Sequence, residues 1–156
     1  MHQEFTSITT LLQYAQETPG HLGKGVYVVG TVSESLAADI SNCSGLNVVG
    51  YRITIDHSAI IHALRQHGQA VEVLRGQLPV DQADVIDLAG WLPTPTVVSD
   101  AGQLKGRLRC LRFELSTVTS RTIAILEVRT GRSRTQLSLK SLLQKKAGSL
   151  SNQPFK

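Results

Sequence analysis

The residues best able to do chemistry stand in two short stretches of the sequence. The first, DHSAIIHALRQHG at 56–68, places His57, His62 and His67 five residues apart. On a helix, positions five apart are separated by about 140°, so these imidazoles cannot grip one metal ion as an i, i+4 pair does. Because histidine titrates near neutral pH, the chemistry this stretch favours is proton transfer by a general acid or base.

Each of these histidines also has a structural explanation. His62 falls opposite the apolar stripe of the predicted helix, beside Ser58 and Arg65, where it can act on a substrate or simply be solvated. His67 falls inside the stripe, next to Gly68, where a packed or C-capping side chain is as good an explanation as a functional one. His57, at the first helical position, is expected to face solvent and to be incidental.

The second stretch, RTIAILEVRTGRSRTQLSLKS at 121–141, sets Glu127 and Arg129 on the same face of a predicted strand. The structural explanation is that Glu127 neutralises Arg129 or Arg132, as common surface pairs do. The functional explanation is that the carboxylate, the guanidinium and the ammonium of Lys140 form one site. Such a site removes a proton and stabilises charge on a phosphorus centre without a metal.

The charges divide sharply along the chain. Up to residue 104 there are four Lys or Arg against ten Asp or Glu, giving −6, and from Lys105 onward there are twelve against two, giving +10. A cationic third is typical of a phosphate-backbone ligand, and it also suits an anionic membrane surface or an acidic protein partner. Arg75, in the acidic part, is either a turn residue or a bidentate ligand of a bound phosphate.

Composition limits the class of protein. With 156 residues, 41% of them hydrophobic, the chain fits one domain with a core of its own. No apolar run approaches the roughly 18 residues of a spanning helix, and the first residues lack the features of a signal peptide. Cys43 and Cys110 fit no metal or redox spacing, so we expect two reduced thiols buried in the core.

Periodicity predicts the elements that position these residues. Helices are predicted over 7–17, 34–43, 57–67 and from Asp81 to about Trp91, with Ser33, Asp56 and Asp81 as caps. Strands are predicted over 23–30 and 46–55, and then over 106–116, 120–130 and 134–144, where Ser138 and Lys140 alternate with leucines. The fold class is therefore α+β, with N-terminal helices and short strands packed on a C-terminal three- to four-stranded antiparallel sheet.

Four stretches together carry a family resemblance: GTVSESLAADI, GLNVVGYRITIDHSAIIHALRQHG, RGQLPVDQADVIDL and ILEVRTGRSRTQLSLKSLLQKK. In order and spacing they resemble the phage-type nuclease domains of the barnase/EndoU/colicin/RelE-like superfamily. Such domains end phage head-morphogenesis proteins and bacterial polymorphic toxins. The resemblance implies an N-terminal helix and linker over 1–23, a nuclease-like toxin domain over 24–147 and a flexible tail over 148–156.

The resemblance implies a metal-independent ribonuclease without a cofactor, which cleaves RNA by attack of a 2′-hydroxyl on the adjacent phosphate. The sheet face would carry the site. The catalytic residues would be His62, Glu127, His67, Arg129 and Lys140, and the substrate-binding residues would be Ser58, Arg75, Arg132, Arg134 and Ser141.

The same resemblance implies the partners. They would be RNA, with tRNA one candidate, and an immunity protein or antitoxin. The positive charge of the C-terminal third predicts that this protein is acidic and covers residues 105–146. We expect a monomer without a membrane partner that acts in the bacterial cytoplasm, after delivery by a secretion system or a phage particle. Two alternatives stay open: a non-catalytic RNA-binding or phage-assembly module, and a toxin transferase that uses a nicotinamide dinucleotide.

Overall fold

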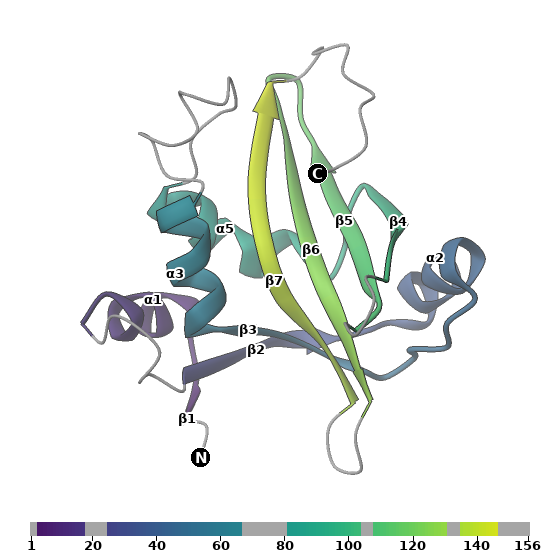
Figure 1. Ribbon diagram of the computed structural model, residues 1–156, viewed down its shortest axis with the longest axis horizontal. Coiled ribbons are helices and arrows are strands. Elements are labelled where there is room, and N and C mark those ends of the chain that lie inside the picture. The colour runs from purple at the N-terminus through teal and green to yellow at the C-terminus, as the bar shows by residue number, and fades with distance from the viewer. Residues whose placement is uncertain (1–2, 18–24, 67–80, 104–107, 131–134, 147–156) are drawn as a thin grey trace.

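A computed structural model describes residues 3–17, 25–66, 81–103, 108–130 and 135–146 (Figure 1). Within those residues the helices are α1 (Ile8–Glu17), α2 (Glu34–Ser44), α3 (His57–Gln66) and α5 (Gln82–Trp91). The strands are β1 (Gln3–Phe5), β2 (Gly25–Thr31), β3 (Arg52–Asp56), β4 (Val97–Gly102), β5 (Cys110–Ser116), β6 (Ser120–Thr130) and β7 (Thr135–Lys146).

All seven described strands belong to one mixed sheet, in the order β1-β2-β3-β7-β6-β5-β4. The predicted antiparallel arrangement of the three C-terminal strands is confirmed, because β5, β6 and β7 pair antiparallel in chain order. The expected size of the sheet was wrong. β2 and β3 do not pack separately against a small sheet, because β3 pairs in parallel with the first residues of β7 and extends the sheet on that side. The α+β class holds.

Local sequence explains where most elements begin and end. The Ser33 side chain accepts the backbone N–H of Leu36, and α2 ends at Gly45, whose φ of +76° suits glycine. Asp81 and Asp84 form the predicted capping box at the start of α5. These three helix boundaries follow the sequence prediction because side chains within a few residues of each boundary determine them.

One strand is shorter than predicted and two were missed. The strand expected over 46–55 begins only at Arg52, because Gly50 turns the chain with a φ of +77° and Tyr51 donates its backbone N–H to the carbonyl of Val48 at 3.0 Å. Neither β1 nor β4 was predicted. The sequence VVSDAG of β4 contains poor strand formers and becomes a strand through its pairing with β5 at the edge of the sheet.

The main core lies on one face of the sheet. Buried side chains of three helices, such as Leu11 of α1, Ile60 of α3 and Leu88 of α5, share one apolar cluster with Phe113 of β5 and Leu126 of β6. Figure 1 shows α5 passing behind β6 and β7 on this side. The first helix therefore belongs to the same core as the rest of the chain. None of the described helices has the length and apolar character needed to cross a bilayer.

Candidate functional site

The opposite face of the sheet collects most of the chemistry predicted from the sequence. Side chains along a strand alternate between its two faces, so the residues between the core positions point to this second side. We call it the polar face, although a small apolar cluster lies within it. Its members are Arg52 and Thr54 of β3; Cys110, Arg112 and Glu114 of β5; Arg121, Ile123, Ile125, Glu127 and Arg129 of β6; and Gln136, Ser138, Lys140, Ser141, Leu143 and Lys145 of β7.

Glu127 stands in the middle strand of the polar face, with Cys110 opposite it on β5 and Ser138 opposite it on β7. Its Oε1 atom accepts a hydrogen bond from Arg129 Nη2 at 3.0 Å, and its side chain is 16% exposed. The prediction that Glu127 and Arg129 share a face is confirmed. No described residue donates a hydrogen bond to the other carboxylate oxygen, Oε2.

A β-bulge places Lys140 close to Glu127. The pairs Leu126–Leu139 and Ile125–Ser141 leave Lys140 as an extra residue in β7. Because a bulge sets two residues against one, Lys140 and Ser141 both fall between core leucines and reach the polar face. Lys140 is then the diagonal neighbour of Glu127. Among the described carboxylates, none lies within ion-pair distance of the Lys140 ammonium.

Ser138 joins this cluster to the strand on its other side. Its hydroxyl lies 3.0 Å from the hydroxyl of Thr54 on β3 and accepts a hydrogen bond from Gln136 Nε2 at 2.8 Å. Thr54 and Ser138 are both almost fully buried. Thr54 and Gln136 were missed because the parallel pairing of β3 with β7 cannot be read from local patterns. The alternation of side chains in RITID predicts that Thr54 faces away from its isoleucine neighbours, but it does not predict which strand lies beside Thr54.

Cys110 reports the electrostatics of the same cluster. Burial raises the pKa of its thiol, Lys140 lowers that pKa and Glu127 raises it again. The ammonium and the carboxylate thus act on one sulfur atom, which places all three groups in one environment. The expectation that both cysteines lie in the core was wrong, because Cys110 alternates with Leu111 and is partly exposed on the polar face. Cys43 is also partly exposed, and both thiols are free.

His62 lies on the exposed side of α3, opposite the buried Ile60 and Ala63, as predicted. Helix α3 contacts β7 and buries Ile60 and Ala63 in the apolar cluster on the core face of the sheet, whereas Glu127 of β6 points to the opposite, polar face. The described hydrogen bonds of Glu127 do not include His62, and the meeting of these two side chains stays a prediction. Ser58 donates to the carboxylate of Asp56 at 2.8 Å and so takes part in the start of α3.

His57 contradicts its prediction. It was expected to face solvent at the first position of the helix, and its side chain is only 4% exposed. The ring packs edge-on against Tyr14, with ring centroids 5.9 Å apart. Helix α1 covers this end of α3, a contact between distant segments that helical periodicity could not indicate. His57 is thus a packed residue at the interface of two helices.

Four residues of the predicted site, His67, Arg75, Arg132 and Arg134, lie outside the described residues. Within the described part of the chain, no group of three or more His, Cys, Asp or Glu side chains is arranged to hold a metal ion.

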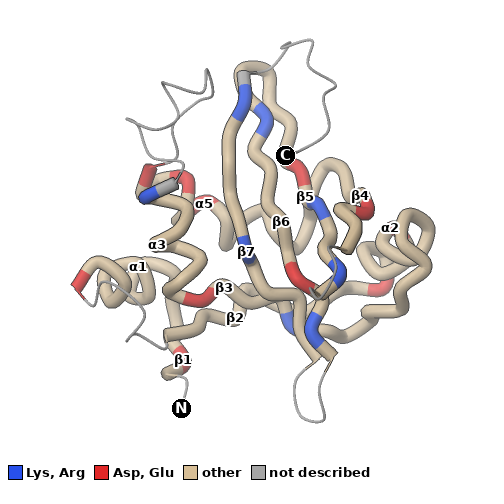
Figure 2. Tube along the Cα trace, viewed as in Figure 1, with Lys and Arg blue, Asp and Glu red and all other residues tan. Residues whose placement is uncertain are grey.

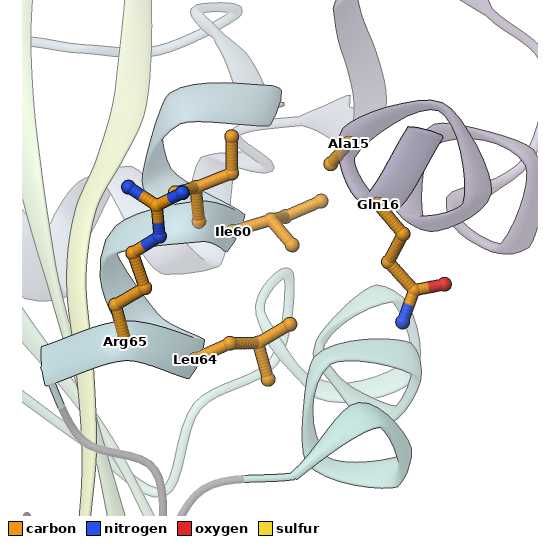
Figure 3. A pocket seen from close by; sticks show the side chains of 6 residues that line it. Ala15, Gln16, Ile60, Leu64 and Arg65 are labelled. Atoms are coloured by element: carbon orange, nitrogen blue, oxygen red, sulfur yellow. The ribbon is translucent and has the colours of Figure 1, made fainter. Parts of the chain in front are cut away.

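An apolar groove of about 170 Å³ lies away from the polar face, between α1 and α3 (Figure 3). It is lined by Ala15, Gln16, Ile60, Ile61, Leu64 and Arg65. Among these described lining residues, the polar groups are the ends of the Gln16 and Arg65 side chains.

Comparison of the chain with protein-family models, with curated proteins and with solved structures finds no match.

Proposed function

We propose that this protein is a metal-independent endoribonuclease toxin with a barnase-like arrangement, and that the polar face is its active surface. The observation that carries the proposal is the gathering of Glu127, Arg129 and Lys140 from two adjacent strands around one partly buried carboxylate. The cationic last third of the sequence and the family resemblance of four sequence blocks support it. Both point to a phosphodiester substrate.

The reaction is transesterification within one RNA strand. Glu127 Oε2 takes the proton of a ribose 2′-hydroxyl, and the 2′-oxygen attacks the adjacent phosphorus. The bond from phosphorus to the 5′-oxygen breaks, and His62, or His67, returns a proton to that oxygen. The products are a 2′,3′-cyclic phosphate and a 5′-hydroxyl. In the converse assignment His62 is the base and Glu127 the acid.

The cations stabilise the charge that develops on the phosphorane. Arg129 already holds Oε1 of Glu127, so the guanidinium fixes the carboxylate and presents its remaining N–H groups beside it. Lys140 supplies an ammonium without a described carboxylate partner. Fixed donors of this kind are typically worth a factor of about 10²–10³ in rate. We expect Ser141 and, from the undescribed segments, Arg75, Arg132 and Arg134 to hold flanking phosphates.

The decisive experiment measures cleavage of a labelled RNA in excess EDTA. Wild type should cleave and leave cyclic phosphate ends, and Glu127→Gln and His62→Ala should each lose about 10²–10⁴ in rate. Glu34→Gln, which neutralises an exposed glutamate of α2 outside the proposed site, is the matched control. Loss of wild-type cleavage in EDTA would refute the metal-free mechanism. Full activity of both variants would refute the assignment of the site.

A non-catalytic RNA-binding module is the second candidate. The observation in its favour is the Glu127–Arg129 ion pair, since a carboxylate that merely neutralises an arginine looks the same. This candidate predicts salt-dependent RNA binding without cleavage in the same assay. Addition of a nicotinamide dinucleotide to that assay tests the third possibility, a toxin transferase.

As a toxin, the protein would act on RNA in the bacterial cytoplasm and need an acidic immunity protein that covers its basic surface. Expression without that partner should arrest bacterial growth, and Glu127→Gln should relieve the arrest. Equal arrest by the Gln variant, at equal protein level, would separate toxicity from this site.

A further inference from the structure

A second group of charges occupies the other end of the polar face. Arg121 on β6 stands directly opposite Lys145 on β7, and Glu114 of β5 lies diagonally beside Arg121. Arg112 is two residues from Glu114 on the same face. Figure 2 shows blue segments of β6 and β7 side by side at the upper ends of these two strands.

These charges do not balance. Glu114 Oε1 accepts a hydrogen bond from Arg121 Nε at 2.5 Å and lies 3.9 Å from Arg112 Nη2. Within the described residues, Lys145 has no carboxylate partner. Two arginines therefore share one carboxylate, and Lys145 adds a third cation opposite Arg121. The side chains of Arg112 and Arg121 are only 18% and 25% exposed, so water screens the excess positive charge poorly, and a bound anion would stabilise it.

The geometry also leaves donors for such an anion. Because Arg121 uses Nε to hold Glu114, its two terminal nitrogens stay available for a phosphate, which a guanidinium binds well. Glu114 acts here as a positioning residue that fixes the guanidinium. The apolar cluster of Ile123, Ile125 and Leu143 separates Arg121 and Lys145 from Glu127, and the six residues from Arg121 to Glu127 along β6 correspond to about 20 Å. Arg112, opposite Ile125, lies between these two ends.

We infer that Arg121 and Lys145 form a distal phosphate subsite that binds the backbone of a single-stranded RNA several nucleotides from the bond cleaved at Glu127, with Arg112 on the path between the two. This inference rests on the proposed function and gives its substrate class, a single strand long enough to span the polar face. A strand laid along β6 would reach both groups of cations across the apolar cluster.

The test measures binding apart from cleavage. Fluorescence anisotropy of a fully 2′-O-methylated dodecanucleotide, which cannot be cleaved, is measured with wild type and with the variants Lys145→Ala, Arg121→Lys, Arg121→Ala and Arg65→Ala. Lys145→Ala should bind about tenfold more weakly, and its slope of log affinity against log salt should be shallower by about 0.7, because one fewer phosphate is neutralised. Arg121→Lys keeps the charge and should lose less affinity than Arg121→Ala. Arg65→Ala should bind like wild type.

A trinucleotide provides the length control, because it cannot reach from Glu127 to the distal cations. Its affinity should be the same for wild type and Lys145→Ala. Equal dodecanucleotide affinity in wild type and Lys145→Ala would overturn the subsite. Polyglutamate is tested as a second ligand, and a Lys145→Ala variant that binds polyglutamate more weakly but RNA normally would also overturn it, because the surface would then bind an acidic protein. If the protein binds as expected but cleaves no RNA, the nuclease proposal fails and the binding subsite stands.

Discussion

Cys110 offers a direct probe of the charges around Glu127, because its thiol lies opposite that carboxylate on the neighbouring strand. A thiolate is stabilised by a nearby cation and destabilised by a nearby anion. The reactivity of this one sulfur therefore measures whether Glu127 and Lys140 stand where the structure places them, whatever reaction the protein performs.

In a Cys43→Ser background, we expect the midpoint of iodoacetamide alkylation against pH to lie above that of a free cysteine, because burial raises the pKa of Cys110. Glu127→Gln removes the anion and should lower the pKa, whereas Lys140→Gln removes the cation and should raise it further. Opposite shifts from the two variants are the signature. Shifts in the same direction would mean that the two side chains do not flank the sulfur.

At the scale of single elements, the capping box of α5 is a local device whose contribution can be isolated. Asp81 Oδ1 accepts the backbone N–H of Asp84 at 3.1 Å, and Asp84 Oδ2 accepts the backbone N–H of Asp81 at 2.8 Å. Asp81→Ala should lower the free energy of unfolding in urea by about 1 kcal/mol, whereas Asp81→Asn, an equally good cap, should stay close to wild type. Equal losses in both variants would show that charge rather than capping matters.

The junction of β2 with α1 depends on a glycine for space. A Cβ atom at Gly25 would lie 2.8 Å from Leu11 Cδ1 and 2.8 Å from Phe5 Cε2, and Leu11 is fully buried and cannot move aside easily. Gly25→Val should therefore lower the melting temperature and cost about 1–3 kcal/mol. Gly90→Ala is the control, because nothing lies within 4 Å of its Cβ and alanine favours a helix. A stable Gly25→Val variant would refute this packing.

How well sequence predicted each element depends on how local its determinants are. The helix over Glu34–Ser44 and the capping box at Asp81 follow from side chains within four residues. The edge strand Val97–Gly102 has a sequence that does not favour a strand, and its partner provides the pairing that makes it one. The burial of His57 likewise depends on Tyr14, forty-three residues earlier in the chain.

At the scale of the whole molecule, the sequence predicted a cationic C-terminal third. The fold places most of the described cations of that third on one face of the sheet. Alternation along β5, β6 and β7 brings Arg112, Arg121, Arg129, Lys140 and Lys145 to one side of the sheet. Arg109 instead forms an ion pair with Asp100 at 2.8 Å, so a charge of the basic third is matched by one of the acidic part. The net charge of a segment therefore overstates the positive charge available to a ligand. The pairing of the strands is needed to show which cations lie next to one another.

The parallel pairing of β3 with β7 joins the N-terminal and C-terminal halves of the sheet, so each half depends on the other for its stability. Strands β1 to β3 are consecutive in the sheet, as are β7 to β4, and the only strand pairing between these blocks in the described residues is β3 with β7. Fragments 1–66 and 81–156, expressed separately, would each expose an open strand edge and an uncovered apolar surface. Mixed together, they should reassemble by complementation, and Thr54→Pro, which forces a kink at the junction, should prevent it. The molecule would then behave as two interlocking pieces, neither of which is stable alone.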